Sequence, residues 1–158
     1  MVDEHIEKKT LTEIEVTPKH GKRNTTAFHK SVKRLQDDGH YFCSHCGVKE
    51  KIEVHHLHEF SLENICDFDK LKEYLITHDE YGYSKLMIDE QITTVDDVRN
   101  LLCLCKPHHT GKGTGIHELE YAVWLAQRTC KKGEDPIPQK DETIQQVEDR
   151  IAEVNDGE

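Results

Sequence analysis

The chain has 158 residues, of which 35% are apolar and 33% are charged, and its net charge is −10 at pH 7. This length fits one domain with a tail. Because few residues are apolar, the core is small and a structural metal would help to stabilise it. The N-terminus lacks a signal sequence, and no apolar stretch approaches the roughly 20 residues that span a bilayer, so we expect a cytoplasmic protein.

The first 40 residues predict a charged N-terminal segment that contains one helix. Residues 12–16 favour a strand, and a basic loop follows over residues 19–24. Thr25 or Thr26 can cap a helix that runs to about Asp38. Its apolar positions recur at spacings of four and three, as expected for one buried helix face, and are Phe28, Val32 and Leu35.

Cysteines and histidines gather in three short segments, which are 43–46 (CSHC), 54–57 (VHHL) and 100–109 (NLLCLCKPHH). Six cysteines in a charged chain without a signal sequence argue against disulfides. Cys43 with Cys46, and Cys105 with His108, have the spacing of two zinc knuckles. Together they predict a structural Cys3His zinc site, in which Cys103 could replace His108.

Alternating apolar and polar residues predict a strand over residues 51–55, and a doubled histidine, His55-His56, lies at its end. Neighbouring residues of a strand point to opposite faces. One imidazole can therefore face a metal while the other faces a substrate.

A long acidic insert over about residues 61–99 separates the doubled histidine from the second knuckle. Its apolar spacing predicts a helix over residues 67–77, and a short capped helix is expected over residues 94–99. The insert is a candidate specificity element or partner-binding element.

The C-terminal third predicts further helices interrupted by glycines. Pro107 suits the first turn of a helix, and the glycine-rich run 111–115 should end that helix. The run is either a linker or a flexible turn that approaches a phosphate. A helix is expected over about residues 116–131, and the acidic segment 134–158 is predicted to be a tail or a peripheral helix.

Positive charge is concentrated beside the knuckles, since residues 19–51 carry a net +5 and residues 101–133 a net +3. The intervening segment 52–100 carries −8 and the tail carries −7. A phosphate backbone responds to local basic patches. Lysines and arginines on the predicted helix are either a solvated face or phosphate contacts. The candidate nucleic-acid contacts are Lys22, Arg23, Lys30, Lys33, Arg34, Lys106 and Lys112.

Over roughly residues 41–117 this pattern resembles the HNH nuclease family, in the His-His form of colicin-type nucleases and many phage-encoded proteins. The resemblance implies an α+β fold, with a small ββα-metal core clamped by the Cys3His zinc site and flanked by helices. We therefore expect an N-terminal segment over 1–40, a nuclease core over 41–133 and a C-terminal tail over 134–158.

The resemblance also implies roles for individual residues. His55 and His109 correspond to ligands of a catalytic metal, and His56 corresponds to the general base. Asn100 corresponds to the residue that orients the base or, in some members, binds metal. His117 is either a third metal ligand or a surface histidine. A histidine titrates near neutral pH and can take a proton from water.

The sequence thus predicts a metal-dependent endonuclease that cuts double-stranded DNA with Mg²⁺, Mn²⁺, Ni²⁺ or Zn²⁺, beside a structural Zn²⁺. If the chain is encoded by a phage, it would act in the cytoplasm of the bacterial host. One alternative is a zinc-stabilised, nuclease-like module that binds a protein partner through its acidic segments. Another is a variant that cuts RNA or nicks one strand.

Overall fold

The computed structural model describes residues 14, 19–131, 138, 141–143, 145–147, 149–150 and 153. The chain divides into two compact units, one formed by Val16–His109 and the other by Met1–Glu15 with Thr110–Glu158. The strand predicted over residues 12–16 lies, Ile14 aside, outside the described residues.

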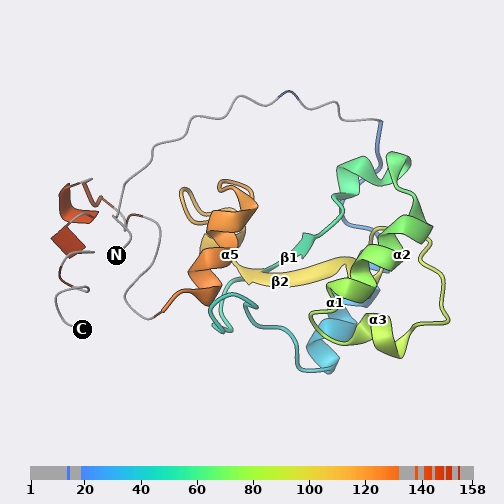
Figure 1. Ribbon diagram of the computed structural model, residues 1–158. Coiled ribbons are helices and arrows are strands. Elements are labelled where there is room, and N and C mark those ends of the chain that lie inside the picture. Colours follow the sequence, from blue (N-terminus) through green and yellow to red (C-terminus); the bar gives the residue numbers. More distant parts are fainter. Residues whose placement is uncertain are drawn as a thin grey trace. The chain divides into compact units, whose positions relative to one another are not determined.

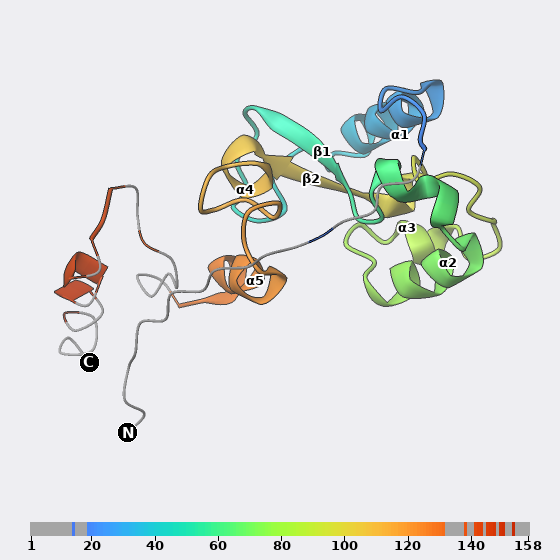
Figure 2. The same cartoon turned by 90° about the horizontal axis from the view of Figure 1, so that it is seen from above.

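A two-stranded antiparallel sheet followed by one helical turn forms the centre of the first unit (Figures 1 and 2). Strand β1 spans Ile52–His56 and strand β2 spans Leu101–Cys105, with Ile52 opposite Cys105 and His56 opposite Leu101. Helix α4, Lys106–His109, follows β2 directly. The expected ββα arrangement is confirmed, and β1 lies one residue later than predicted.

Helix α1, Thr26–Asp37, forms where the sequence predicts it. The hydroxyl oxygen of Thr25 accepts a hydrogen bond from the backbone N–H of Phe28 at 3.0 Å and caps the first turn. Leu35 is fully buried, and Gly39 follows the helix with a φ of +80°, a conformation that favours glycine. The apolar face of α1 therefore packs into the core of the unit.

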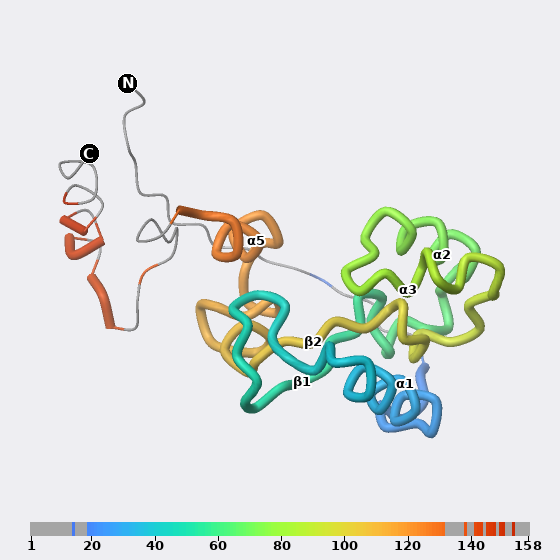
Figure 3. The backbone as a smooth tube through the Cα atoms, turned by 90° about the horizontal axis from the view of Figure 1, so that it is seen from below, coloured from blue at the N-terminus to red at the C-terminus, as the bar shows by residue number. Residues whose placement is uncertain are grey.

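The segment between the strands forms four short helical elements, which are η1 (Phe60–Ile65), α2 (Phe68–Thr77), α3 (Tyr83–Leu86) and η2 (Val98–Asn100). Figure 3 shows this segment folding back on itself at the end of the sheet where β1 ends and β2 begins. The carboxylate of Asp67 caps α2 and confirms that predicted helix. The main core of the unit consists of Leu35, Val54, Tyr83, Val98, Leu101 and Cys103.

The short helix predicted over residues 94–99 is replaced by the 3₁₀ turn η2, which begins four residues later. The cause lies in two adjacent aspartates with different partners. Asp96 is bound to α1 and β1, while the Asp97 carboxylate caps η2 by accepting from the backbone N–H of Arg99 at 3.0 Å. These contacts hold Asp96 outside a helix.

In the second unit, helix α5 spans Tyr121–Thr129, shorter than the predicted 116–131. Gly115 accepts bonds from the N–H groups of Glu118 and Leu119, so the preceding residues form turns. Glu120, with a ψ of 139°, is extended and delays the helix start. Trp124 is buried, at 3% exposed. Among the described residues, no helix combines the length and apolarity needed to cross a membrane.

Candidate metal and catalytic centre

Three cysteines and one histidine gather around a common point. The sulfur atoms of Cys46 and Cys105 lie 3.8 Å apart, and Nδ1 of His108 lies 3.2 Å from the sulfur of Cys105 and 3.8 Å from that of Cys43. All four ligand atoms lie within 4.8 Å of one another. Thiolates about 2.3 Å from a tetrahedral zinc lie about 3.8 Å apart, so the set fits Zn²⁺.

Their place in the fold separates the thiols of the Cys3His group from the thiol of Cys103. Burial raises the pKa of Cys43, but the backbone N–H groups of Cys105, Cys46 and His45 outweigh it and lower that pKa overall. Burial raises the pKa of Cys105 to about 12, so binding of a metal ion there would release its proton. Cys103 is fully buried in the apolar core, where burial raises its pKa to about 11. Cys103 therefore lies outside the cluster, and His108 is the fourth member.

Tyr81, from the insert, ties the first knuckle to β2. Its hydroxyl accepts from the backbone N–H of Cys103 at 2.9 Å and lies 3.1 Å from the hydroxyl of Ser44. The backbone N–H of Ser44 in turn donates to the Cys103 carbonyl at 2.9 Å. Gly47, with a φ of +81°, closes the knuckle by donating to the carbonyl of Cys43. The insert thus supports the geometry of the Cys3His group.

His55 and His109 face each other across the contact between β1 and α4. Their rings lie 5.2 Å apart at 71°, and a nitrogen of one lies within 4.8 Å of a nitrogen of the other. Both side chains are buried, and each Nδ1 has a carboxylate beside it. Glu53 accepts from His109 at 2.7 Å, and Glu59 lies 3.9 Å from His55. Carboxylates commonly hold metal-ligating histidines as Glu53 holds His109, a contact that leaves Nε2 of His109 for an ion.

His56 points to the opposite face of β1, as the alternation of a strand requires. Its Nε2 lies 2.8 Å from Oδ1 of Asp96. The ring is 2% exposed and stacks on Phe28, with centroids 5.2 Å apart and an angle of 21°. The two adjacent histidines therefore occupy different environments, each with its own carboxylate.

The Asn100 side chain bonds to backbone rather than to the His56 ring. Its Oδ1 accepts from the N–H of His58 at 2.9 Å, and its Nδ2 donates to the carbonyls of His58 and Val95 at 3.0 and 2.7 Å. The side-chain partner of the His56 imidazole is Asp96 instead. Asn100 is fully buried and fixes the loop that follows β1.

The predicted nucleic-acid contacts of the first unit fall into two groups. In the first group, Lys33 pairs with Asp37 at 2.8 Å, Arg34 lies 4.9 Å from the ring centroid of Tyr83, and Arg23 donates to a β1 carbonyl at 3.4 Å. These contacts do not test phosphate binding, so the predicted roles of Arg23, Lys33 and Arg34 stay predictions. The other group consists of Lys22, Lys30 and Lys106, which are exposed, as are Arg23 and Lys33 of the first group.

Two further candidates, Lys112 and His117, belong to the second unit and are exposed. Their predicted roles, phosphate contact and third metal ligand, stay predictions.

Sequence reasoning missed three carboxylates of this centre. Glu53 precedes His55 by two residues, so strand periodicity could have placed it on the same face. Glu59 follows His55 by four residues. Asp96 lies 40 residues from His56, and no local pattern links the two.

Comparison with known families gives one match, in which residues 43–111 match the model of a family described as HNH endonuclease. The matched segment contains both knuckles, the doubled histidine, Asn100 and His109. No curated protein and no solved structure matches the chain.

Proposed function

The chain belongs to the HNH endonuclease family through residues 43–111, and from this premise we propose that it is a metal-dependent endonuclease that hydrolyses the phosphodiester bonds of double-stranded DNA. The observation that carries the proposal is the convergence of His55 and His109, each beside a carboxylate, from separate parts of the chain. A pair of imidazoles buried in this way is suited to hold an ion rather than to fill a core.

His55 and His109 are the proposed ligands of the divalent cation, and His117 remains a candidate third ligand from the sequence. Bound there, the cation would stabilise the negative charge that develops on the phosphate and on the leaving oxygen. Imidazole ligands accept Mn²⁺, Ni²⁺ and Zn²⁺ as well as Mg²⁺, so we expect several ions to support activity. The Cys3His set holds a separate, structural Zn²⁺ in this proposal.

His56 is the proposed general base. Its imidazole takes a proton from a water molecule, and the water oxygen forms a bond to phosphorus. The bond from phosphorus to the 3′ oxygen breaks, and that oxygen takes a proton from solvent. The products carry 5′-phosphate and 3′-hydroxyl ends. Asn100 supports this step by fixing the loop after His56.

The exposed lysines are the proposed phosphate contacts. Lys22, Lys30 and Lys106 are exposed in the first unit, and Lys112 is exposed in the second. Each phosphate that such a lysine neutralises releases counterions, so binding should weaken steeply as salt rises.

Plasmid cleavage tests the proposal directly. Wild-type protein should convert supercoiled plasmid to nicked or linear DNA when Mg²⁺, Mn²⁺ or Ni²⁺ is added. His56→Ala should lose at least about 100-fold in rate, in the range that removal of a general base costs. His56 is buried, so His56→Gln serves as a second variant, and circular dichroism confirms that each variant is folded.

His78→Ala is the matched control, because His78 is exposed on the insert and outside the centre. It should cleave at the wild-type rate. A wild-type protein that is inert with every cation would contradict the nuclease proposal and would favour the module that binds a partner through its acidic segments. Equal cleavage by wild type and both His56 variants would remove His56 from the mechanism.

A further inference from the structure

Asp96 and His56 form a buried pair that joins the insert to β1. We propose that Asp96 is a positioning residue, which holds His56 with its proton on Nε2 and directs Nδ1 toward the attacking water. This inference rests on the proposed role of His56 as general base. It also gives the long insert a role in the chemistry, because the insert supplies the carboxylate.

The contact with Asp96 favours one tautomer of His56. Oδ1 of Asp96 lies 2.8 Å from Nε2 of His56, and the two residues are 4% and 2% exposed. An ionised carboxylate only accepts hydrogen bonds, so Nε2 must carry the proton that is donated. The lone pair of a neutral ring then lies on Nδ1, which is the nitrogen left to act as the base.

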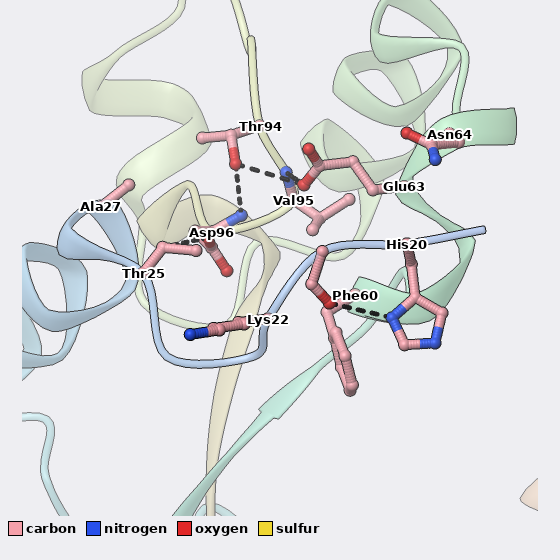
Figure 4. A pocket seen from close by; sticks show the side chains of 11 residues that line it. His20, Lys22, Thr25, Ala27, Phe60, Glu63, Asn64, Thr94, Val95 and Asp96 are labelled. Carbon is pink, nitrogen blue, oxygen red and sulfur yellow. Dashed lines mark hydrogen bonds between the residues drawn. The ribbon is translucent and has the colours of Figure 1, made fainter.

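Asp96 is itself held firmly by α1 and by its own loop. The Thr25 hydroxyl donates to Oδ2, the Ser31 hydroxyl donates to the Asp96 carbonyl at 2.6 Å, and the Asp96 backbone N–H donates to the Thr94 hydroxyl at 3.2 Å. Figure 4 shows Asp96 between Thr25 and Thr94 at the wall of a cavity of about 210 Å³. The carboxylate therefore has little freedom to turn away from His56.

The imidazole is confined on its faces as well. Phe28 of α1 stacks on it at 5.2 Å, and the ring of Phe60 lies 6.0 Å away. A ring packed between aromatic groups can be set to one orientation by a single hydrogen bond. A purely structural contact would not require a charge here, since burying a carboxylate is costly and an apolar pair packs as well.

Nuclear magnetic resonance of the His56 ring nitrogens, measured without added catalytic cation, tests the tautomer independently of cleavage. We expect the wild-type ring to be protonated on Nε2 when neutral. Asp96→Ala should give a mixture of the two tautomers, whereas Asp96→Asn should keep the Nε2–H form because its amide oxygen still accepts. A wild-type ring protonated on Nδ1, or a tautomer unchanged in Asp96→Ala, would overturn the proposal.

Cleavage kinetics provide the second arm. Asp96→Ala should lower kcat by about 10–100-fold with little change in KM, and Asp96→Asn should lie between Asp96→Ala and wild type. Asp38→Ala is the matched control, because it removes a carboxylate that accepts from the Tyr83 hydroxyl at 2.7 Å, a contact that does not involve His56 or Asp96. It should lower the melting temperature and leave kcat unchanged.

The two proposals fail in different ways. If the wild-type protein does not cut DNA but shows the expected tautomers, the nuclease proposal is contradicted, while the contact that positions His56 is supported. If the wild-type protein is active and the kcat of Asp96→Ala lies within twofold of the wild-type kcat, only the positioning role of Asp96 is contradicted. A drop in kcat for Asp38→Ala as large as that for Asp96→Ala would mean that lost stability, and not lost positioning, lowers kcat, and would also overturn the proposal.

Discussion

At the scale of single residues, the centre consists of imidazoles that are each paired with a carboxylate. Strand β1 separates them by alternation, because Glu53 and His55 point toward α4 while His56 points toward Asp96. One strand of five residues thus serves two chemical environments. The proposed metal ligands lie on one face of the strand and the proposed base on the other.

The pair formed by Glu53 and His109 leads to a prediction about metal affinity. Glu53→Ala should weaken binding of Ni²⁺ or Mn²⁺ by about 10–100-fold, because the partner of a ligating imidazole fixes its tautomer and raises its basicity. Glu53→Gln, which keeps an acceptor but loses the charge, should have a smaller effect. Isothermal titration calorimetry on zinc-loaded protein measures both dissociation constants.

Glu50 provides the control for this prediction, because it is an exposed carboxylate just before β1. Glu50→Ala should bind the ion as tightly as wild type. Equal dissociation constants for Glu53→Ala and Glu50→Ala would show that the 2.7 Å contact with His109 has no influence on metal binding.

At the scale of elements, one buried arginine organises the acidic insert. Arg99 lies in η2, and its Nε and Nη2 both bind the Asp97 carboxylate at 2.8 Å. The guanidinium also donates to three backbone carbonyls, of Met87, Glu90 and Gln91. All five donors are thereby used, and the last part of the insert closes against the start of β2.

Removal of Arg99 should therefore destabilise the unit strongly. Arg99→Ala should lower the free energy of unfolding by about 3–5 kcal/mol, because it leaves a buried carboxylate and three carbonyls without their donor. Urea denaturation measures this change. Lys85→Ala, at an exposed position of α3, should stay within about 0.5 kcal/mol of wild type. If Arg99→Ala changed the free energy of unfolding by no more than Lys85→Ala does, water would replace the guanidinium at no cost, and the prediction would be wrong.

The elements that the sequence predicted well are those specified by nearby residues. The cap of Thr25 and the spacing of Phe28, Val32 and Leu35 define α1 locally, and Asp67 does the same for α2. Two helix starts were misplaced because distant or extended residues decide them. Asp96 is held by α1, and Glu120 is extended.

At the scale of the whole molecule, the sequence indicated which residues meet but not what holds them. Cysteine and histidine spacing was enough to predict the Cys3His set, because few other arrangements place such residues in two knuckles. The partners of the imidazoles were not predictable in the same way. Strand periodicity is enough to place Glu53 on the same face as His55. The contact between Asp96 and His56 depends instead on how the segment between them folds, since the two residues lie 40 positions apart.

The first unit has a small core, so its stability should depend on zinc. His108→Ala and Cys43→Ala should both lose zinc and the cooperative thermal transition, because structural zinc contributes on the order of 10 kcal/mol in small domains. Cys103→Ala is the matched control, since Cys103 is as buried as Cys43 but packs in the apolar core. It should keep its zinc, measured by elemental analysis, while its melting temperature falls through the cavity it leaves. Zinc retained by His108→Ala and lost by Cys103→Ala would instead make Cys103 the fourth ligand.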